Sequence, residues 1–437
     1  MTAVVGIINK QGVAIAADSA VTRTLGNKGT KYTKNGSKML RLSNAVPVSV
    51  MLTGNGAYIE NPWDVIVRRY RQQRGDIEHP TVESCMHDFF AYIADTPIFW
   101  NDDVINEWIT RSLDQMIDRV NDEIPWETRR TKDDGTYVRP QGFKNAFVKE
   151  LQILRKTISS KGRCPQFADY TIDQFRAYAT PILDEYFDNR FEESDPFGTW
   201  FTQDFLDSVR SEIELTLMEE LSCRCEDMDD LAVLIFSGFG KEQEYPSLVS
   251  ANVCEGFDHR VNYHVRKEDI VCISDEKPVA FCPFAQKDVT QSIIRGIYRT
   301  WGHNLLVNTK LFYNDIAGYV FPTTFEEQDP VFLEMLSEVK HADLSGTLRK
   351  SMLQQLNKNQ SEWERALEGY DLKAMAELAE SLIDLTGFQR ILTFEQEGVG
   401  GPVDVAVITK NEGFTWIKRK SWHLHRDVNG EYGSMGI

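Results

Sequence analysis

The sequence predicts an α+β protein in which strands at the two ends of the chain enclose helical blocks. Nearly continuous apolar runs at 3–8 and 13–17 are typical of strands that are covered on both faces. Apolar residues recur at spacings of three and four through 62–228 and through much of 287–390, as in amphipathic helices. No tandem repeat or low-complexity linker separates these blocks, so we expect one sheet-centred domain.

Composition and charge limit the function classes. The chain has 437 residues, 42% of them hydrophobic, and a formal net charge of −18. This excess of carboxylates argues against a nucleic-acid partner. No apolar run is long enough for a membrane span and no signal peptide is visible, so we expect a cytoplasmic protein without a membrane partner. The 7 cysteines are few and odd in number, and we expect reduced thiols.

The first predicted element is a hairpin that joins the two N-terminal runs through the polar residues 9–12. With its turn centred near Lys10, the residue numbers of cross-strand partners sum to about 20. This register places Thr2 directly across from Asp18, a lone acid at the end of an apolar run.

A second hairpin is expected from 38–42 through 43–47 into 48–53. Its pairing brings Lys38 close to Gly54, at the far end of the partner strand. Further strands are expected within 229–275, at 231–236, 247–253, 259–264 and 270–273. A helix should follow from Asp288 to Gly302, since Ile293, Ile294, Ile297 and Trp301 share one face.

These elements make up one predicted domain over 1–437. Its parts are core strands in 1–60 and 229–275, a helical insertion at 62–228, a helical region at 287–390 and a closing hairpin at 400–420. In that hairpin, strands at 404–409 and 414–418 flank a turn at 410–413.

The candidate chemistry lies where the two N-terminal hairpins meet. Removal of Met1 would leave Thr2 with a free α-amino group, which can take the proton of the threonine hydroxyl near neutral pH. A lysine in reach favours the neutral amine and the developing alkoxide, and an aspartate holds that lysine. Lys38 and Asp18 suit these roles, and the backbone N–H of Gly54 suits an oxyanion hole.

Four stretches in order carry a family resemblance: Thr2, then 12–19 (GVAIAADS), then Lys38-Met39-Leu40, then 51–57 (MLTGNGA). They resemble the opening of proteasome β subunits and their bacterial relatives, the threonine branch of the N-terminal-nucleophile hydrolases. The resemblance implies a four-layer αββα sandwich, here with two helical insertions. It also implies that Thr2 is the nucleophile, Asp18 the buried acid, Lys38 the tuning lysine and Gly54 the oxyanion glycine.

Later stretches are also similar to the family, at 236–240 (FSGFG) and at 400–405 (GGPVDV). The chain departs from the family pattern at several places. Lys34 competes with Lys38, and Val399 and Gln396 stand where the family has a serine and an aspartate. We find no counterpart of the family's mid-strand serine near 283–286, and Glu395 or Glu397 could compensate.

The predicted function is an amide-bond hydrolase, a threonine peptidase acting on a peptide or amide substrate through an acyl-enzyme. The alternatives are a catalytically silent proteasome-like assembly subunit and a small-molecule acylase of the same superfamily. The resemblance implies a homo-oligomer, and the insertions could recruit a partner protein. No cofactor or metal site is expected, because the histidine pairs 423/425 and 259/264 have no acidic or cysteine partner at ligand spacing.

Overall fold

The computed structural model describes residues 3–24, 30–33, 37–124, 141–192, 203–223, 231–285, 287–296, 304, 344–392, 401–419, 425–426 and 432–433. Its contacts divide the chain into two compact units. Unit 1 comprises 1–39, 243–247 and 271–437, and unit 2 comprises 40–242 and 248–270. Each unit combines antiparallel strands with helices, so the predicted α+β class is confirmed.

Unit 1 is built on a five-stranded antiparallel sheet in the order β13-β1-β2-β14-β15. Its strands are β1 (Val4–Asn9), β2 (Gly12–Ala17), β13 (Val279–Ala285), β14 (Asp404–Thr409) and β15 (Gly413–Lys418). The short strands outside this sheet are β3 (Val21–Thr24), β4 (Thr30–Thr33), β12 (Val271–Cys272), β16 (His425–Arg426) and β17 (Tyr432–Gly433). The hairpins β1–β2 and β14–β15 match the two predicted from the ends of the chain.

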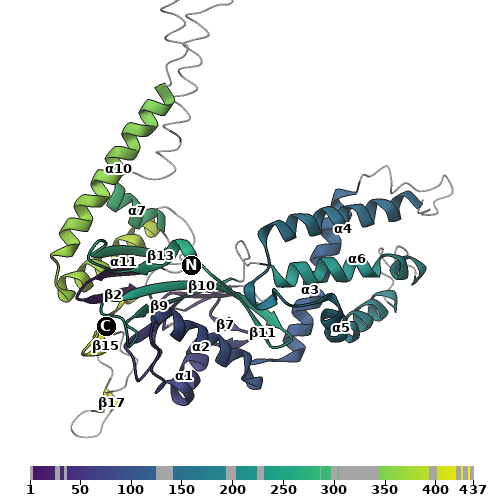
Figure 1. The fold of residues 1–437 in the computed structure, drawn as a ribbon, viewed down its shortest axis with the longest axis horizontal. Coiled ribbons are helices and arrows are strands. Elements are labelled where there is room, and N and C mark those ends of the chain that lie inside the picture. Colours follow the sequence, from purple (N-terminus) through teal and green to yellow (C-terminus); the bar gives the residue numbers. More distant parts are fainter. Residues whose placement is uncertain are drawn as a thin grey trace, which may run out of the picture. The chain divides into compact units, whose positions relative to one another are not determined.

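Three helices accompany this sheet: α7 (Lys287–Arg295), α10 (Leu344–Glu368) and α11 (Leu372–Leu392), seen with it in Figure 1. Buried side chains of α11, such as Met375 and Ala379, share a hydrophobic core with Val5 and Ile7 of β1. On the other face of the sheet, side chains such as Val13 are also fully buried. Burial on both faces explains why β1 and β2 are apolar throughout rather than alternating.

Unit 2 contains most of a second antiparallel sheet, in the order β11-β10-β9-β6-β5. Its strands are β5 (Met39–Arg41), β6 (Val48–Gly54), β9 (Ala232–Gly238), β10 (Ser247–Phe257) and β11 (Arg260–Val265). The boundary between the units passes through β5, after Met39. A small hairpin, β7 (Ala57–Tyr58) with β8 (Asn61–Pro62), follows β6.

Two helices share a core with the sheet of unit 2: α1 (Trp63–Arg74) and α2 (Val82–Ala94). A capping box starts α2, in which Thr81 and Ser84 satisfy each other's backbone N–H groups. Phe89 and Phe90 of α2 meet Phe236 of β9 edge to face, with ring centroids 5.7 and 5.9 Å apart. Aromatic pairs of this geometry contribute beyond the area that they bury.

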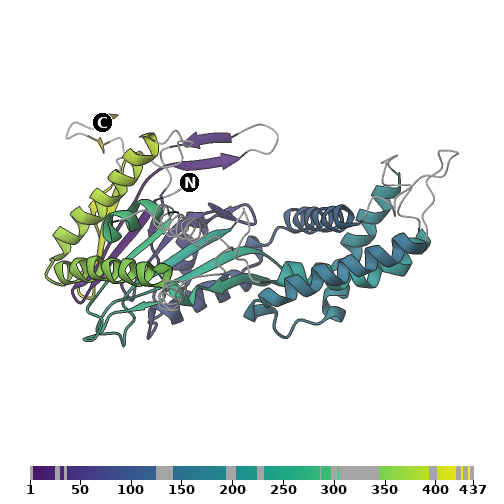
Figure 2. The same ribbon diagram turned by 90° about the horizontal axis from the view of Figure 1, so that it is seen from above.

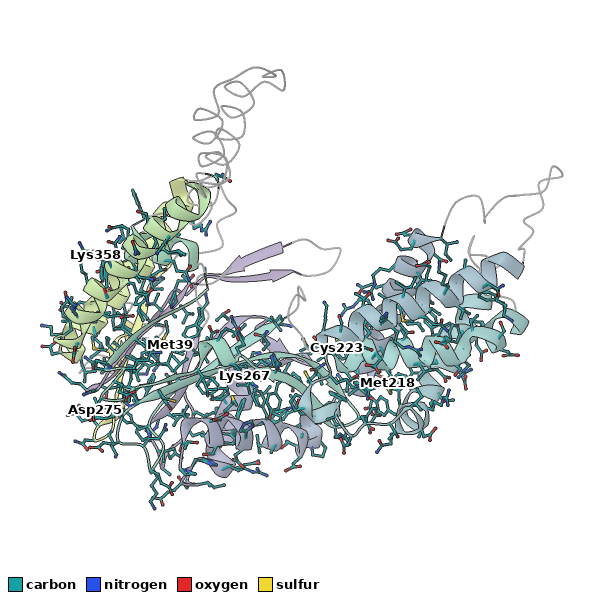
Figure 3. The ribbon with its side chains drawn as sticks, turned by 45° about the horizontal axis from the view of Figure 1, so that its top comes forward. Met39, Met218, Cys223, Lys267, Asp275 and Lys358 are labelled. Carbon is teal, nitrogen blue, oxygen red and sulfur yellow. The ribbon has the colours of Figure 1, made fainter. Side chains whose placement is uncertain are left out.

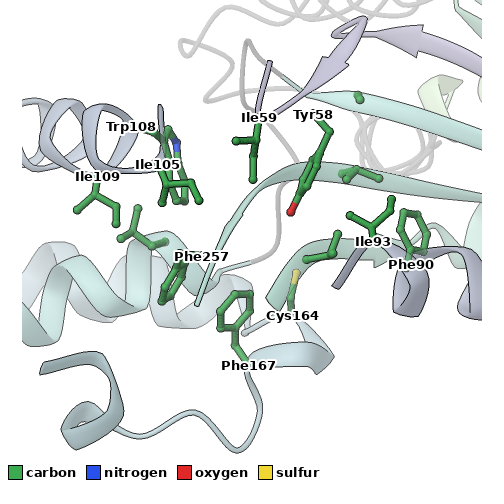
Figure 4. Close-up of a cluster of buried hydrophobic side chains, with 14 of the residues drawn as sticks. Tyr58, Ile59, Phe90, Ile93, Ile105, Trp108, Ile109, Cys164, Phe167 and Phe257 are labelled. Carbon is green, nitrogen blue, oxygen red and sulfur yellow. The ribbon is translucent and has the colours of Figure 1, made fainter. Parts of the chain in front are cut away.

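Four longer helices form a bundle in unit 2, visible side by side in Figure 2. They are α3 (Asp102–Glu123), α4 (Gln141–Lys161), α5 (Ile172–Glu192) and α6 (Gln203–Ser222). Phe257, at the end of β10, joins the bundle to the sheet (Figure 4). It is fully buried, stacks on Phe167 with centroids 4.8 Å apart, and meets Trp108 of α3 at 6.4 Å. The predicted helical insertion therefore shares one hydrophobic core with a strand of the sheet.

Two sequence expectations need correction. The sequence expectations include no strand at β13, which contains Pro283, a residue without a backbone N–H for a ladder hydrogen bond. The structure resolves this conflict by placing β13 at the edge of the sheet. Cys254 is disulfide-bonded, so the expectation of reduced thiols is wrong for this residue.

Among the described residues, no helix has both the length and the apolar character needed to cross a bilayer.

Candidate active site

Asp18 lies directly after β2, at the end of the sheet where β1 begins. Its carboxylate is 1% exposed and is held by three donors from three segments of unit 1. The Ala3 N–H donates to Oδ1 at 2.8 Å, Lys38 Nζ donates to the same oxygen at 2.6 Å, and the Ala20 N–H donates to Oδ2 at 3.2 Å. Hydrogen bonds to an ionised acceptor are among the stronger ones, so this carboxylate is a fixed point of the local structure.

Lys38 is the cationic half of this arrangement. Its side chain is 7% exposed and forms an ion pair with Asp18 at 2.6 Å. The next residue, Met39, begins β5 and is fully buried, which fixes the backbone from which Lys38 extends (Figure 3). An ammonium in such a setting has little solvent to screen it and acts strongly on neighbouring groups. The structure therefore joins Asp18 and Lys38, as the sequence predicts.

The register of the first hairpin differs by one residue from the prediction. Pairs run from Val4↔Ala17 to Asn9↔Gly12, so partner numbers sum to 21. The side chain of Asn9 accepts the Gln11 N–H at 2.9 Å, which fixes a two-residue turn at Lys10-Gln11. Asp18 consequently stands opposite Ala3, whose carbonyl accepts the Asp18 N–H at 3.1 Å. The expected register is therefore off by one over the described pairs, and residue 2 itself lies outside the described residues.

Two buried polar residues near Asp18 were missed by sequence reasoning. Ser19 is 0% exposed, and its hydroxyl donates to the Pro402 carbonyl at 2.5 Å. Asp404, the first residue of β14, is 2% exposed and pairs with Ala17. Asp404 was detectable in principle as a lone acid in the apolar run 403–408, but only the sheet order brings β14 beside β2.

Gly54 lies at the end of β6 in unit 2, where it pairs with Ala232. Its φ is +79°, and a Cβ at this position would lie 2.0 Å from the carbonyl oxygen of Leu231. The backbone conformation and the close carbonyl thus require glycine at this position. Gly54 and Lys38 belong to different units, so the expected proximity of the two stays a prediction.

Several predicted site residues lie outside the described part of the chain. Thr2 precedes the first described residue, and Lys34 lies in the gap at 34–36. The stretch 393–400, which holds Glu395, Gln396, Glu397 and Val399, is also outside it. Within the described residues, no three histidine, cysteine or acidic side chains are grouped so that they could hold a metal ion.

The arrangement at the end of β1 and β2 has a definite chemical capacity. A buried ammonium beside the first residues of the chain stabilises negative charge that develops there and disfavours a second positive charge. The carboxylate of Asp18 accepts hydrogen bonds from that ammonium and from the Ala3 N–H. The Ala3 nitrogen is the one that the peptide bond joins to residue 2.

The chain matches neither a protein-family model nor a curated protein.

Proposed function

We propose that this chain is an amide-bond hydrolase whose nucleophile is the hydroxyl of Thr2, exposed by removal of Met1. The observation that carries the proposal is the three-way contact at Asp18. One carboxylate oxygen binds both the Lys38 ammonium and the amide nitrogen of Ala3. The carboxylate that binds this buried cation is thus hydrogen-bonded to the peptide N–H of Ala3, the residue that follows the proposed nucleophile.

In the proposed reaction, the α-amine of Thr2 takes the hydroxyl proton while the oxygen attacks the substrate's carbonyl carbon. The C–N bond then breaks, and the leaving amine carries away a proton from the α-ammonium. The product is an ester on Thr2, which a water molecule hydrolyses with the same amine as base. Lys38 would favour the neutral amine and the developing alkoxide, and Asp18 would hold Lys38 in place.

We also propose that the chain has the four-layer αββα sandwich fold that the resemblance implies. Each unit has a sheet that shares a hydrophobic core with helices. The face of the unit 1 sheet turned away from α11 is apolar and buried, as an inner sandwich face would be. In this arrangement Gly54 would offer its N–H to the oxyanion.

The test is reaction with a threonine-directed epoxyketone, followed by peptide mapping. Intact-mass measurement first establishes whether Met1 has been removed. We expect a label on the N-terminal peptide of the wild type, none in Thr2→Ala, and slow labelling in Lys38→Met. Thr2→Ser is the matched control, because it keeps a hydroxyl at the same position and should be labelled.

Absence of label on a protein shown to begin with Thr2 would overturn the proposal and favour the catalytically silent reading. If labelling occurs, a panel of peptides and simple acyl amides separates a peptidase from a small-molecule acylase. Both readings use the same acyl-enzyme, so the panel bears on substrate class alone.

A further inference from the structure

We propose that the exposed face of α4 in one copy of this chain docks on the exposed face of α5 in a second copy. The contact joins the copies head to tail, because the two faces belong to different helices of one bundle. The inference concerns the surface of the helical bundle in unit 2 and does not depend on the proposed chemistry. It gives the helical insertion a role in assembly.

Helix α4 is a basic element in an acidic chain. Within Gln141–Lys161, five side chains are basic and one is acidic, whereas the whole chain has a formal net charge of −18. The basic residues are Lys144, Lys149, Arg155, Lys156 and Lys161, and the acid is Glu150. A helix with this charge balance attracts an acidic surface and disfavours a basic one.

The solvent-facing stripe of α4 places an apolar side chain between two lysines. Lys149, Ile153 and Lys156 follow one another at spacings of four and three, so they share one face of the helix. Both lysines are exposed, and neither forms an ion pair within the described residues. The side chain of Ile153 lies between them and is 47% exposed. Phe147 and Leu151 are fully buried, which directs the lysine stripe to solvent.

The solvent-facing stripe of α5 has the complementary composition. Ala177 and Pro181 are exposed and lie about one turn apart. Glu185 and Asp188 continue the same face, are exposed, and form no ion pair within the part of the chain that the structure describes. Over the whole of α5, five acidic residues stand against two arginines. This face therefore offers negative charge beside a small apolar surface.

The bundle keeps the two faces apart. Both α4 and α5 pack against α3 and α6, so they occupy opposite corners of the bundle (Figure 1). Charges directed toward α6 are paired within the chain. Arg155 of α4 binds Glu212 of α6 at 3.2 Å, and Arg176 of α5 binds Glu214 of α6 at 2.8 Å. The exposed lysines of α4 and the exposed acids of α5 are thus the charges that a second molecule meets.

The charge pattern selects both the partner and the way in which it docks. Two α4 faces would bring lysines against lysines, and two α5 faces would bring carboxylates against carboxylates. The α4 face against the α5 face instead pairs opposite charges and covers Ile153 with the apolar part of α5. A second copy carries the required acidic face on its own bundle. Because each copy keeps one face of each kind, the contact repeats and gives a ring or a filament.

The size of the contact sets its strength. Each of the two helices has 21 residues and is therefore about 32 Å long. An interface made by one helix from each copy lies at the lower end of the size range of specific interfaces. We therefore expect association at micromolar protein concentrations. Salt should weaken it, because the paired charges lie near the surface.

The experiment measures the mass of the full chain in solution by sedimentation velocity at about 0.05 M and about 1 M NaCl. We expect wild-type assemblies larger than a monomer at low salt and monomers at high salt. The α4 variant, Lys149→Glu with Lys156→Glu, should be monomeric at both salt concentrations. The α5 variant, Glu185→Lys with Asp188→Lys, should behave in the same way. All four side chains are exposed, so both variants should fold, which circular dichroism verifies.

A mixture of the two variants is the decisive sample. The new glutamates on α4 of one variant meet the new lysines on α5 of the other, and the remaining native faces also have opposite charges. The mixture should therefore assemble at low salt although neither variant does so alone. The matched control is Lys350→Glu with Lys358→Glu on α10, which makes the same charge change at exposed lysines of unit 1. It should assemble like the wild type.

A wild-type protein that stays monomeric at low salt would overturn the inference. Assembly that persists in both variants would also overturn it, and so would a mixture of the variants that stays monomeric. None of these measurements involves the epoxyketone label at residue 2. A protein that takes no label can still assemble through α4 and α5, so the failure of this inference and that of the proposed function are distinguishable.

Discussion

Among the described residues of unit 1, two lysine–aspartate pairs have the same separation of 2.6 Å between Nζ and Oδ1. In the pair at the candidate site, the side chains of Lys38 and Asp18 are 7% and 1% exposed. In the pair beside the first hairpin turn, the side chains of Lys10 and Asp275 are 37% and 80% exposed. Asp275 is labelled in Figure 3. The two ion pairs thus have the same length, but one is buried and the other is exposed to solvent. This difference in burial decides how much each pair affects the free energy of unfolding.

The largest effect on stability is expected from Lys38→Met. The substitution leaves the Asp18 carboxylate buried without its cation, and breaking a buried pair in this way costs about 3–5 kcal/mol of folding free energy. We expect the urea midpoint to fall accordingly. The double variant Lys38→Met with Asp18→Asn is the control and should recover part of the loss, because no buried charge remains. A single variant as stable as the wild type would show that the site is hydrated in solution.

A pair of glycines extends the comparison to backbone surroundings in unit 2. At Gly54, φ is +79° and a Cβ would lie 2.0 Å from the Leu231 carbonyl oxygen. At Gly56, a Cβ would meet nothing within 4 Å. We expect Gly54→Ala to destabilise the protein by about 2 kcal/mol and Gly56→Ala to have little effect. Urea unfolding of both variants measures the difference, and equal midpoints would contradict the structure at the end of β6.

The same contrast between buried and exposed groups is expected in the pH-dependent reactivity of two thiols. Burial raises the pKa of Cys85 to about 12, whereas Cys272 is exposed. Iodoacetamide at about pH 9 should therefore modify Cys272 and spare Cys85 until urea is added. Because the pKa of Cys85 is raised on folding, its neutral form stabilises the protein fully below the ordinary thiol pKa. That contribution is lost as pH rises toward the folded pKa. Early alkylation of Cys85 would contradict its burial beside Tyr70.

The smallest effect is expected at the exposed pair. The hydrogen bond to Asp275 raises the pKa of Lys10, and the same bond lowers the pKa of Asp275. Any stabilisation by the pair is present above the ordinary aspartate pKa and is lost as pH falls through the lowered one. Lys10→Met should leave the urea midpoint at neutral pH unchanged at all salt concentrations. A fall in the urea midpoint as large as that of Lys38→Met would contradict the expected difference between the buried and the exposed ion pair.

The sequence was a good guide to what depends on local pattern. The hairpins 4–17 and 404–418 follow from apolar runs around polar turns. The pairing of Asp18 with Lys38 follows from the expected hairpins and from the chemistry of the two side chains, and the family resemblance implies it as well. The one-residue register error arose because Asn9 caps the turn through its own side chain, a detail that apolar patterning does not reveal. Ser19 and Asp404 escaped notice because their importance depends on β14 lying beside β2, far apart in sequence.

The position of Phe257 has a practical consequence for anyone who trims this chain. Its ring lies against Phe167, Tyr170, Phe175 and Tyr178 of the insertion as well as Trp108 of α3. Excising 62–228 would remove these rings from the end of β10 and would also remove α1 and α2, whose side chains share a core with the sheet. A shortened version of the protein would therefore need to keep α1 and α2 and to replace the apolar contacts of Phe257.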